Sequence, residues 1–189
     1  MSESVRSFIA VPVPAETASR LAAAQERLRA SGDDIKWVRP ESIHLTLKFL
    51  GAVEPERLRA LWQSLREALA GQRSFMARLR GLGAFPGPAR ARVVWAGLAE
   101  GAEELGALAA RVEEVCAQHG FPPEERPFRA HLTLGRVRRP APNPGLEAAI
   151  AAGADAELGE VPVERVLLMK SELRRDGARY HVLDEIALL

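Results

Sequence analysis

Two histidines in this chain each stand two residues before a threonine, in identical His-Leu-Thr-Leu tetrapeptides that begin at His44 and His131. The chain holds four histidines and three threonines among 189 residues, so two such pairs by chance have a probability on the order of one in a thousand. Residues two apart on an extended strand point to the same side. We therefore expect His44 to share a face with Thr46, and His131 with Thr133, with the leucines on the opposite face.

Two imidazoles in one cleft can carry out acid–base catalysis. Because the pKa of a histidine lies near about 6.5, one ring can be neutral while the other is protonated around neutral pH. Threonine hydroxyls on the same face can donate hydrogen bonds to the oxygens of an anion held between the rings. A single histidine on a strand is usually structural. Two histidines, each with a threonine on the same face of its strand, favour a catalytic site.

Three basic residues lie close to the tetrapeptides in the sequence. Strand alternation predicts that Lys48 and Arg129 project on the same faces as the His/Thr pairs, where they could offset phosphate charge. Arg136 has the opposite parity, unless a bulge at Gly135 redirects it. A solvated surface role is the alternative for all three.

Two aromatic residues are candidates for stacking on a nucleobase, as aromatic side chains do at single-stranded RNA sites. They are Phe8 and Trp37, and core packing is the alternative for both. The other two histidines, His119 and His181, lack a threonine partner and are interpreted as structural. The lone Cys116 falls on the apolar side of a helical pattern and is expected to be buried.

The secondary structure that must position these residues follows from apolar periodicity and turn residues. Strands are expected at residues 8–11, 43–50, 75–82, 92–98 and 128–137, and helices at 21–28, 58–69, 105–115 and, briefly, 146–152. Strands at 163–173 and 178–188 form a closing hairpin around an Asp176-Gly177 turn.

This order of elements predicts an α+β fold built from two related halves, with 131 − 44 = 87 residues between the motif histidines. Each half would bury the apolar side of an antiparallel sheet under its helices. A pseudo-twofold arrangement would then bring the two open sheet faces together around a central groove. The length favours one bilobal domain over residues 1–189.

Composition narrows the class of protein. The formal net charge is +1, so any nucleic-acid contact is expected to be local. The sequence begins without a basic stretch followed by a long apolar one, and it has no run of eighteen apolar residues, so a cytoplasmic protein without a membrane span is expected. Two histidines without further Cys, His or carboxylate at ligand spacing make a poor metal site, and no Gly-rich phosphate loop suggests ATP dependence, so no cofactor is expected.

The motifs and their flanks also carry a family resemblance over nearly the whole chain. The relevant stretches are Arg6 to Ala10, Trp37 to Gly51, Gly81 to Pro86, Glu125 to Arg136 and Ser171 to Leu173. With these residues the chain resembles the two-histidine phosphoesterases, and within them the bacterial and archaeal RNA 2′,3′-cyclic phosphodiesterases, also called 2′-5′ RNA ligases.

The resemblance implies a bilobal α+β fold and a metal-independent mechanism. His131 would be the proton acceptor that activates water for attack on the cyclic phosphate. His44 would be the proton donor to the departing 3′-oxygen, which leaves a 2′-phosphomonoester. Thr46 and Thr133 would hold the phosphoryl oxygens. The expected partner is RNA with a 2′,3′-cyclic phosphate end, tRNA fragments included, and the expected state is a monomer.

Other functions fit the same residues. The reverse reaction would join a cyclic-phosphate end to a 5′-hydroxyl through a 2′-5′ linkage. The basic stretch from Arg126 to Arg139 would also suit a module that binds RNA ends without turnover, although binding alone needs arginine or lysine more than titratable rings. A related phosphodiesterase for 2′-5′ oligonucleotides or small cyclic nucleotides is the third alternative.

Overall fold

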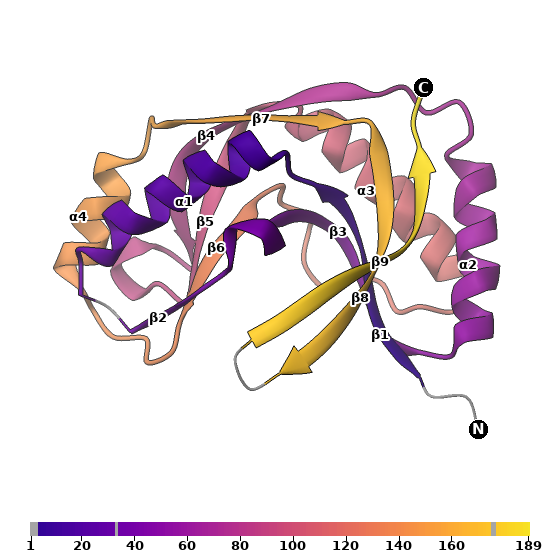
Figure 1. Cartoon of the computed structure of the whole chain (residues 1–189), viewed down its shortest axis with the longest axis horizontal. Helices are drawn as coiled ribbons and strands as arrows, with labels where there is room; N and C mark the ends of the chain where they lie inside the picture. The colour runs from indigo at the N-terminus through magenta and orange to yellow at the C-terminus, as the bar shows by residue number, and fades with distance from the viewer. Residues whose placement is uncertain (1–3, 33, 175–176) are drawn as a thin grey trace.

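A computed structural model describes residues 4–32, 34–174 and 177–189, and Figure 1 shows them as a curled sheet with helices on its outer side. The strands are β1 (Val5–Pro12), β2 (Ile35–Trp37), β3 (His44–Val53), β4 (Phe75–Phe85), β5 (Val93–Glu100), β6 (Leu132–Val137), β7 (Glu157–Val163), β8 (Arg165–Arg174) and β9 (Gly177–Ala187). The α-helices are α1 (Ala15–Arg29), α2 (Pro55–Ala68), α3 (Ala102–Gln118) and α4 (Pro144–Ala152). The predicted α+β class is confirmed.

All strand pairings are antiparallel, and the strands run in the order β7-β4-β5-β6-β3-β1-β8-β9, with β2 added to β6. The two sheets expected from the sequence are the two halves of one continuous sheet. The halves meet where β3 pairs with β6. One residue pair, Leu45 with Leu132, forms that junction. The two motif strands are therefore neighbours at the centre of the sheet.

The helices cover the outer side of the sheet in two groups. Helix α1 packs against β7 and α4, while α3 packs against β3, β5 and α2. Helix α1 follows β1 in sequence but covers the other half of the sheet, so the two halves are interlocked.

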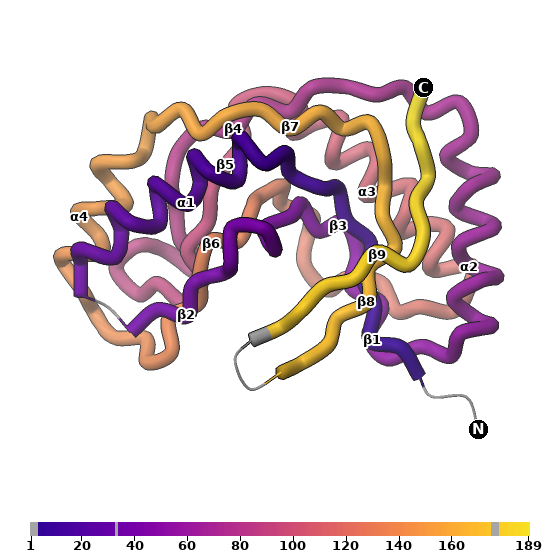
Figure 2. The backbone as a smooth tube through the Cα atoms, in the orientation of Figure 1, coloured from indigo at the N-terminus to yellow at the C-terminus, as the bar shows by residue number. Residues whose placement is uncertain are grey.

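Figure 2 shows the β8–β9 hairpin reaching across the open, inner side of the sheet. The predicted turn at Asp176 lies outside the described residues. No described helix has the length and apolar character needed to span a membrane.

The structure contains two strands that the sequence did not predict, β2 and β7, and β6 is shorter than expected. Strand β7 is an edge strand of the sheet, a place that tolerates its Pro162, and β2 has only three residues. Strand β6 begins at Leu132 rather than at residue 128, since residues 128–131 are not part of a strand ladder. His131 therefore stands just before its strand.

Both motif strands carry a bulge three residues after the histidine. Ile9 of β1 pairs with Lys48 and Ala10 pairs with Thr46, so Leu47 has no partner. In the same way, Val94 of β5 pairs with Gly135 and Trp95 pairs with Thr133, so Leu134 has no partner on β5. A bulge reverses the alternation of the residues that follow it, and two consecutive residues are buried at each bulge, Leu47 with Lys48 and Leu134 with Gly135.

A buried glutamine of α1 braces the second bulge. The Gln25 side chain is 2% exposed, and its Nε2 donates to the carbonyls of Leu134 and Val38, both at 2.8 Å. The Val38 N–H donates to the same Leu134 carbonyl at 2.9 Å. Gln25 therefore supplies a hydrogen bond at the residue that the β5–β6 ladder leaves out.

We expect Gln25→Leu to lower the free energy of unfolding by about 1–3 kcal/mol, because it leaves buried carbonyls without this donor. Urea unfolding followed by circular dichroism measures the change. Gln63→Leu is the matched control, since Gln63 is exposed on α2 and bonds to Glu67 of the same helix; its effect is expected to stay within about 0.5 kcal/mol. Equal stability of the two variants would contradict the bracing role.

Candidate active site

The ring of His44 is oriented by the backbone that precedes it. Its Nδ1 lies 2.8 Å from the Ser42 carbonyl oxygen, and because a carbonyl only accepts hydrogen bonds, Nδ1 carries the proton. Phe8 stacks on the ring at 4.7 Å between centroids, and Tyr180 meets it edge-on at 5.2 Å. These contacts leave Nε2 as the nitrogen available for chemistry.

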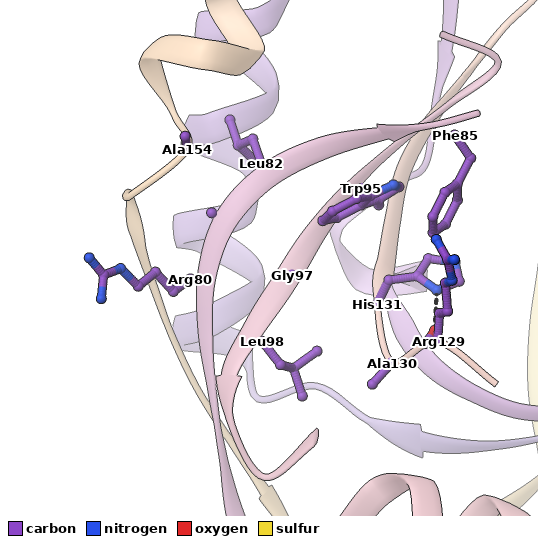
Figure 3. Close-up of a pocket in the computed structure, with 11 residues that line it drawn as sticks. Arg80, Leu82, Phe85, Trp95, Gly97, Leu98, Arg129, Ala130, His131 and Ala154 are labelled. Atoms are coloured by element: carbon purple, nitrogen blue, oxygen red, sulfur yellow. Dashed lines mark hydrogen bonds between the residues drawn. The ribbon is translucent and has the colours of Figure 1, made fainter. Parts of the chain in front are cut away.

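His131 is held in the same manner in the other half. Its Nδ1 donates to the Arg129 carbonyl oxygen at 2.6 Å, the dashed line of Figure 3. Phe85 meets the imidazole edge-on at 5.1 Å. Each motif histidine is thus clamped by the carbonyl two residues before it, and each has its Nε2 unbonded within the described part of the chain.

The strand register brings the two motifs together. Leu45 and Leu132 are paired and essentially buried, at 1% and 0% exposure. One residue away, the same antiparallel register sets His44 alongside Thr133, and Thr46 alongside His131. Because these four residues flank the buried leucines, their side chains lie on the inner face. Each imidazole therefore has the threonine of the other motif as its neighbour.

Burial lowers the pKa of both imidazoles. For His44, desolvation lowers the pKa below its ordinary value, while the bond to the Ser42 carbonyl acts in the opposite direction. For His131, desolvation again dominates, the Arg129 carbonyl opposes it, and the positive charge of Arg136 lowers the pKa further. In the free protein both rings are thus neutral at pH 7, with Nε2 as an acceptor.

A cavity lies beside each histidine. The one next to His131 has a volume of about 380 Å³ and includes Phe85, Trp95 and Arg129 in its lining (Figure 3). The cavity next to His44 has a volume of about 570 Å³ and includes Tyr180 and other residues of the β8–β9 hairpin. An anion between the two rings would therefore have a separate cavity on each side.

The prediction that Lys48 faces the groove is wrong. The bulge at Leu47 turns Lys48 to the helix side, where its side chain is 2% exposed. Its ammonium group donates to Glu113 of α3 at 2.9 Å and to the Pro122 carbonyl at 2.7 Å. Lys48 therefore ties the first motif strand to the segment that leads into His131.

The two arginines lie near His131. Arg129 lines the cavity beside that histidine, although its segment is not a strand. Arg136 follows the bulge at Leu134, is exposed, and is close enough for its charge to lower the pKa of His131. A bulge therefore redirects Arg136, as the sequence analysis expected. The bulge lies at Leu134, one residue before the predicted Gly135.

Phe8 and Trp37, the two predicted base-stacking residues, do not present an open ring face to the groove. Phe8 is 2% exposed and packs on His44, which leaves no open face for a base. Trp37 packs against the core and carries the Arg29 guanidinium over its ring at 5.2 Å. The aromatic residues that line the cavities instead are Tyr180, Phe85 and Trp95, and Phe49 and Phe128 stand exposed at 58% and 38%. Phe49 is turned outward by the bulge that buries Lys48.

Comparison with known proteins gives consistent matches. The family model described as LigT-like phosphoesterase matches residues 11–95 and 97–180. A relative from Aeropyrum pernix is 38% identical over 170 residues, covering 88% of this chain and 94% of its own, and one from Methanothermobacter thermautotrophicus is 35% identical over 176 residues, covering 93% and 95%. Both are named RNA 2′,3′-cyclic phosphodiesterase.

Solved structures match over the same length. The crystal structure of a Thermus thermophilus protein has a TM-score of 0.79 and 34% identity, covering 97% of each chain. Escherichia coli LigT complexed with 3′-AMP has a TM-score of 0.74 and 29% identity, covering 98% of each chain. The described fold is thus similar to these structures from end to end.

We expect both motif histidines to titrate below pH 6.5 in the free protein, because burial disfavours the charged ring. NMR titration of the imidazole nitrogens measures each pKa, and single His44→Gln and His131→Gln variants assign the signals. The same spectra should show the proton of each neutral ring on Nδ1. A pKa above that ordinary value for either ring would contradict the burial argument.

Removing Glu113 should destabilise the protein more than removing Lys48. Glu113→Ala leaves the buried ammonium group with the Pro122 carbonyl and, as its nearest carboxylate, the more distant Glu124 at 3.8 Å, and we expect a loss of about 3 kcal/mol. Lys48→Met removes the charge itself, so we expect about 1 kcal/mol from the unpaired carbonyl. Urea unfolding compares them, with Glu114→Ala as the exposed control on the same helix. A larger loss for Lys48→Met would refute this order.

Proposed function

The chain belongs to the LigT-like phosphoesterase family, and we propose that it opens RNA 2′,3′-cyclic phosphate ends to 2′-phosphomonoesters by acid–base catalysis between His44 and His131. Its activity is that of a cyclic phosphodiesterase, a hydrolase, as the names of relatives aligned over most of its length indicate. The observation that carries the mechanism is the pairing of Leu45 with Leu132, which sets each imidazole beside the threonine of the other motif.

The two rings act on opposite sides of the phosphorus atom. At His131, Nε2 takes a proton from water as the water oxygen bonds to phosphorus. The bond from phosphorus to the 3′-oxygen breaks on the other side, and His44 Nε2 donates a proton to that oxygen. The 2′-oxygen keeps the phosphate. The anionic substrate favours the imidazolium form, which offsets the effect of burial on the His44 ring.

An asymmetry between the motifs supports the acceptor role of His131. Five residues after His131 stands Arg136, whose charge disfavours a second positive charge on that ring. The equivalent place after His44 holds the uncharged Phe49. The Arg136 charge therefore disfavours the proton on His131, while burial disfavours the proton on both rings.

The remaining inner-face residues stabilise the phosphate. Thr46 and Thr133 donate from their hydroxyls to the non-bridging oxygens, where negative charge shifts during the displacement. Arg129 and Arg136 supply positive charge beside His131. Lys48 is not assigned to the phosphate, because its ammonium group is occupied by Glu113 and Pro122.

Nucleic acid is the substrate class of this family, and we propose RNA fragments with cyclic ends, tRNA fragments included, as the natural substrates. The complex of E. coli LigT with 3′-AMP supports a nucleotide ligand in this fold. We propose that residues 1–189 act as one domain and as a monomer, since helix α1 of the first half covers the second half. A cytoplasmic location stays a prediction.

We expect His44→Ala and His131→Ala each to lower kcat by about a thousandfold, because each removes one partner of the proton transfers. Thr46→Val and Thr133→Val should cost roughly a hundredfold. The assay is hydrolysis of an oligonucleotide with a 2′,3′-cyclic phosphate end in excess EDTA. Phosphorus NMR assigns the product as the 2′-phosphate.

The matched control is His119→Ala, since His119 bonds to Ser64 far from the groove and should keep full activity. Full turnover in both motif-histidine variants would refute the mechanism. Tight binding of the cyclic end without turnover by the wild type would instead identify a module that binds RNA ends.

A further inference from the structure

The bulge of the second motif strand turns two consecutive residues of β6 to the helix side. Leu134 is 0% exposed, and Gly135 is buried beside it. A Cβ atom built on Gly135 would stand 2.6 Å from Cγ2 of Ile35 and 3.0 Å from Cε3 of Trp37, both on strand β2, which pairs with β6. The bulge therefore brings the backbone so close to the β2 side chains that glycine fits there without displacing them.

Gln25 supplies polar contacts to this bulge from helix α1. Its amide nitrogen carries two protons and donates to the carbonyls of Leu134 and Val38, both at 2.8 Å. Leu134 has no cross-strand partner on β5, so its carbonyl relies on Gln25 and on the Val38 N–H at 2.9 Å. Because a buried carbonyl that loses a donor costs free energy, these bonds favour the bulged path of β6 over a regular one.

The bulge decides the direction of Arg136. In a regular strand that alternates from Thr133, Arg136 would point to the helix side. With one residue added, it comes instead to the groove side, where it is exposed. Arg138 and Arg139 pair with Asp34, whereas Arg136 forms no ion pair with a residue that the structure describes. The path of the backbone therefore sets where its charge lies.

The charged or titratable groups around His131 are Arg80, Arg129, Arg136, Lys36 and His44. Arg80 is paired with Asp155 at 2.9 Å, and Arg129 lies before the motif. Lys36 is the cross-strand partner of Arg136 on β2. Arg136 is thus a cation beside His131 whose position depends on the bulge.

We propose that Gln25 is a positioning residue for the reaction, which holds the second bulge so that Arg136 faces the phosphate beside His131. This inference rests on the proposed function, because Arg136 acts there on the phosphate. Gln25 lies on the helix side of the sheet, so it acts through the backbone of β6. Gly135 serves the same purpose, since it permits the close approach of the bulge to β2.

A double-mutant cycle tests whether Gln25 acts through Arg136. We expect Gln25→Leu and Arg136→Gln each to lower kcat/KM for adenosine 2′,3′-cyclic phosphate about tenfold, the size of one hydrogen bond to a charged group. The double variant should lie within about twofold of Arg136→Gln alone, because both changes remove the same interaction. Losses that multiply to about a hundredfold, or full activity in Gln25→Leu, would overturn the proposal.

Thr17→Val is the matched control on the same helix. Thr17 is 4% exposed, and its hydroxyl donates to the Glu160 carbonyl of β7 at 2.6 Å. This variant also takes a donor from a carbonyl, but at the edge strand instead of a motif strand. It should keep kcat/KM close to the wild-type value. An equal loss of activity in Thr17→Val and Gln25→Leu would show that Gln25 only supports the fold.

The pKa of His131, measured by NMR titration, gives a readout that lower stability alone does not move. When Arg136 is no longer held near the ring, protonation becomes easier, so the pKa of His131 should rise in Gln25→Leu and in Arg136→Gln. It should stay unchanged in Thr17→Val. The His44 ring is the internal reference, because burial and the Ser42 carbonyl set its pKa. An unchanged pKa of His131 in Gln25→Leu would overturn the proposal.

Gly135→Ala reaches the same bulge without removing the amide, and it decides the question if Gln25→Leu does not fold. Its methyl group would meet Ile35, so it should give the same rise in the pKa of His131 and the same lack of further loss with Arg136→Gln. If the wild type does not hydrolyse the cyclic compound, the proposed function fails, while the pKa comparison still decides the role of Gln25.

Discussion

The arrangement of the site depends on one backbone pairing, that of Leu45 with Leu132 between β3 and β6. Each half of the sheet supplies one motif, and this pair fixes how the motifs face each other. A slip of either strand by one residue would send the His/Thr pair of that strand to the helix side. One ladder pair offers few hydrogen bonds, so the register is secured by the two leucines buried beneath it, each worth about 1.5–3 kcal/mol.

Local alternation predicts the inner-face residues up to each bulge and fails after it. The motif histidines, threonines and leucines lie as strand parity requires, because the alternation is reversed only after the bulge residues Leu47 and Leu134. Lys48 and Phe49 exchange sides because Leu47 is left out of the pairing with β1. Gly135 hints at the second bulge in the sequence, whereas Lys48 gives no such sign at the first, since the neighbouring strand determines where a ladder skips.

The surroundings of the motifs could not be predicted for a related reason. The cavity beside His131 combines β4, β5 and the segment before β6, and only the sheet register shows that they meet. The glycine at position 83 suggests flexibility or a turn in the sequence, but in the sheet it makes room for Trp95 across the β4–β5 pair. Helix positions were predictable because 3.6-residue periodicity is local, whereas cavities depend on long-range pairing.

The two carbonyl clamps reach the same geometry by different means. Before His44, the Ser42 carbonyl belongs to a short 3₁₀ turn that begins at Pro40. Before His131, the Arg129 carbonyl belongs to an irregular segment, which must be anchored from outside. Lys48 and Glu113 provide that anchor upstream, by binding the Pro122 carbonyl and the Glu124 N–H. The bulge that removes Lys48 from the groove therefore connects the first motif strand to the support of the second histidine.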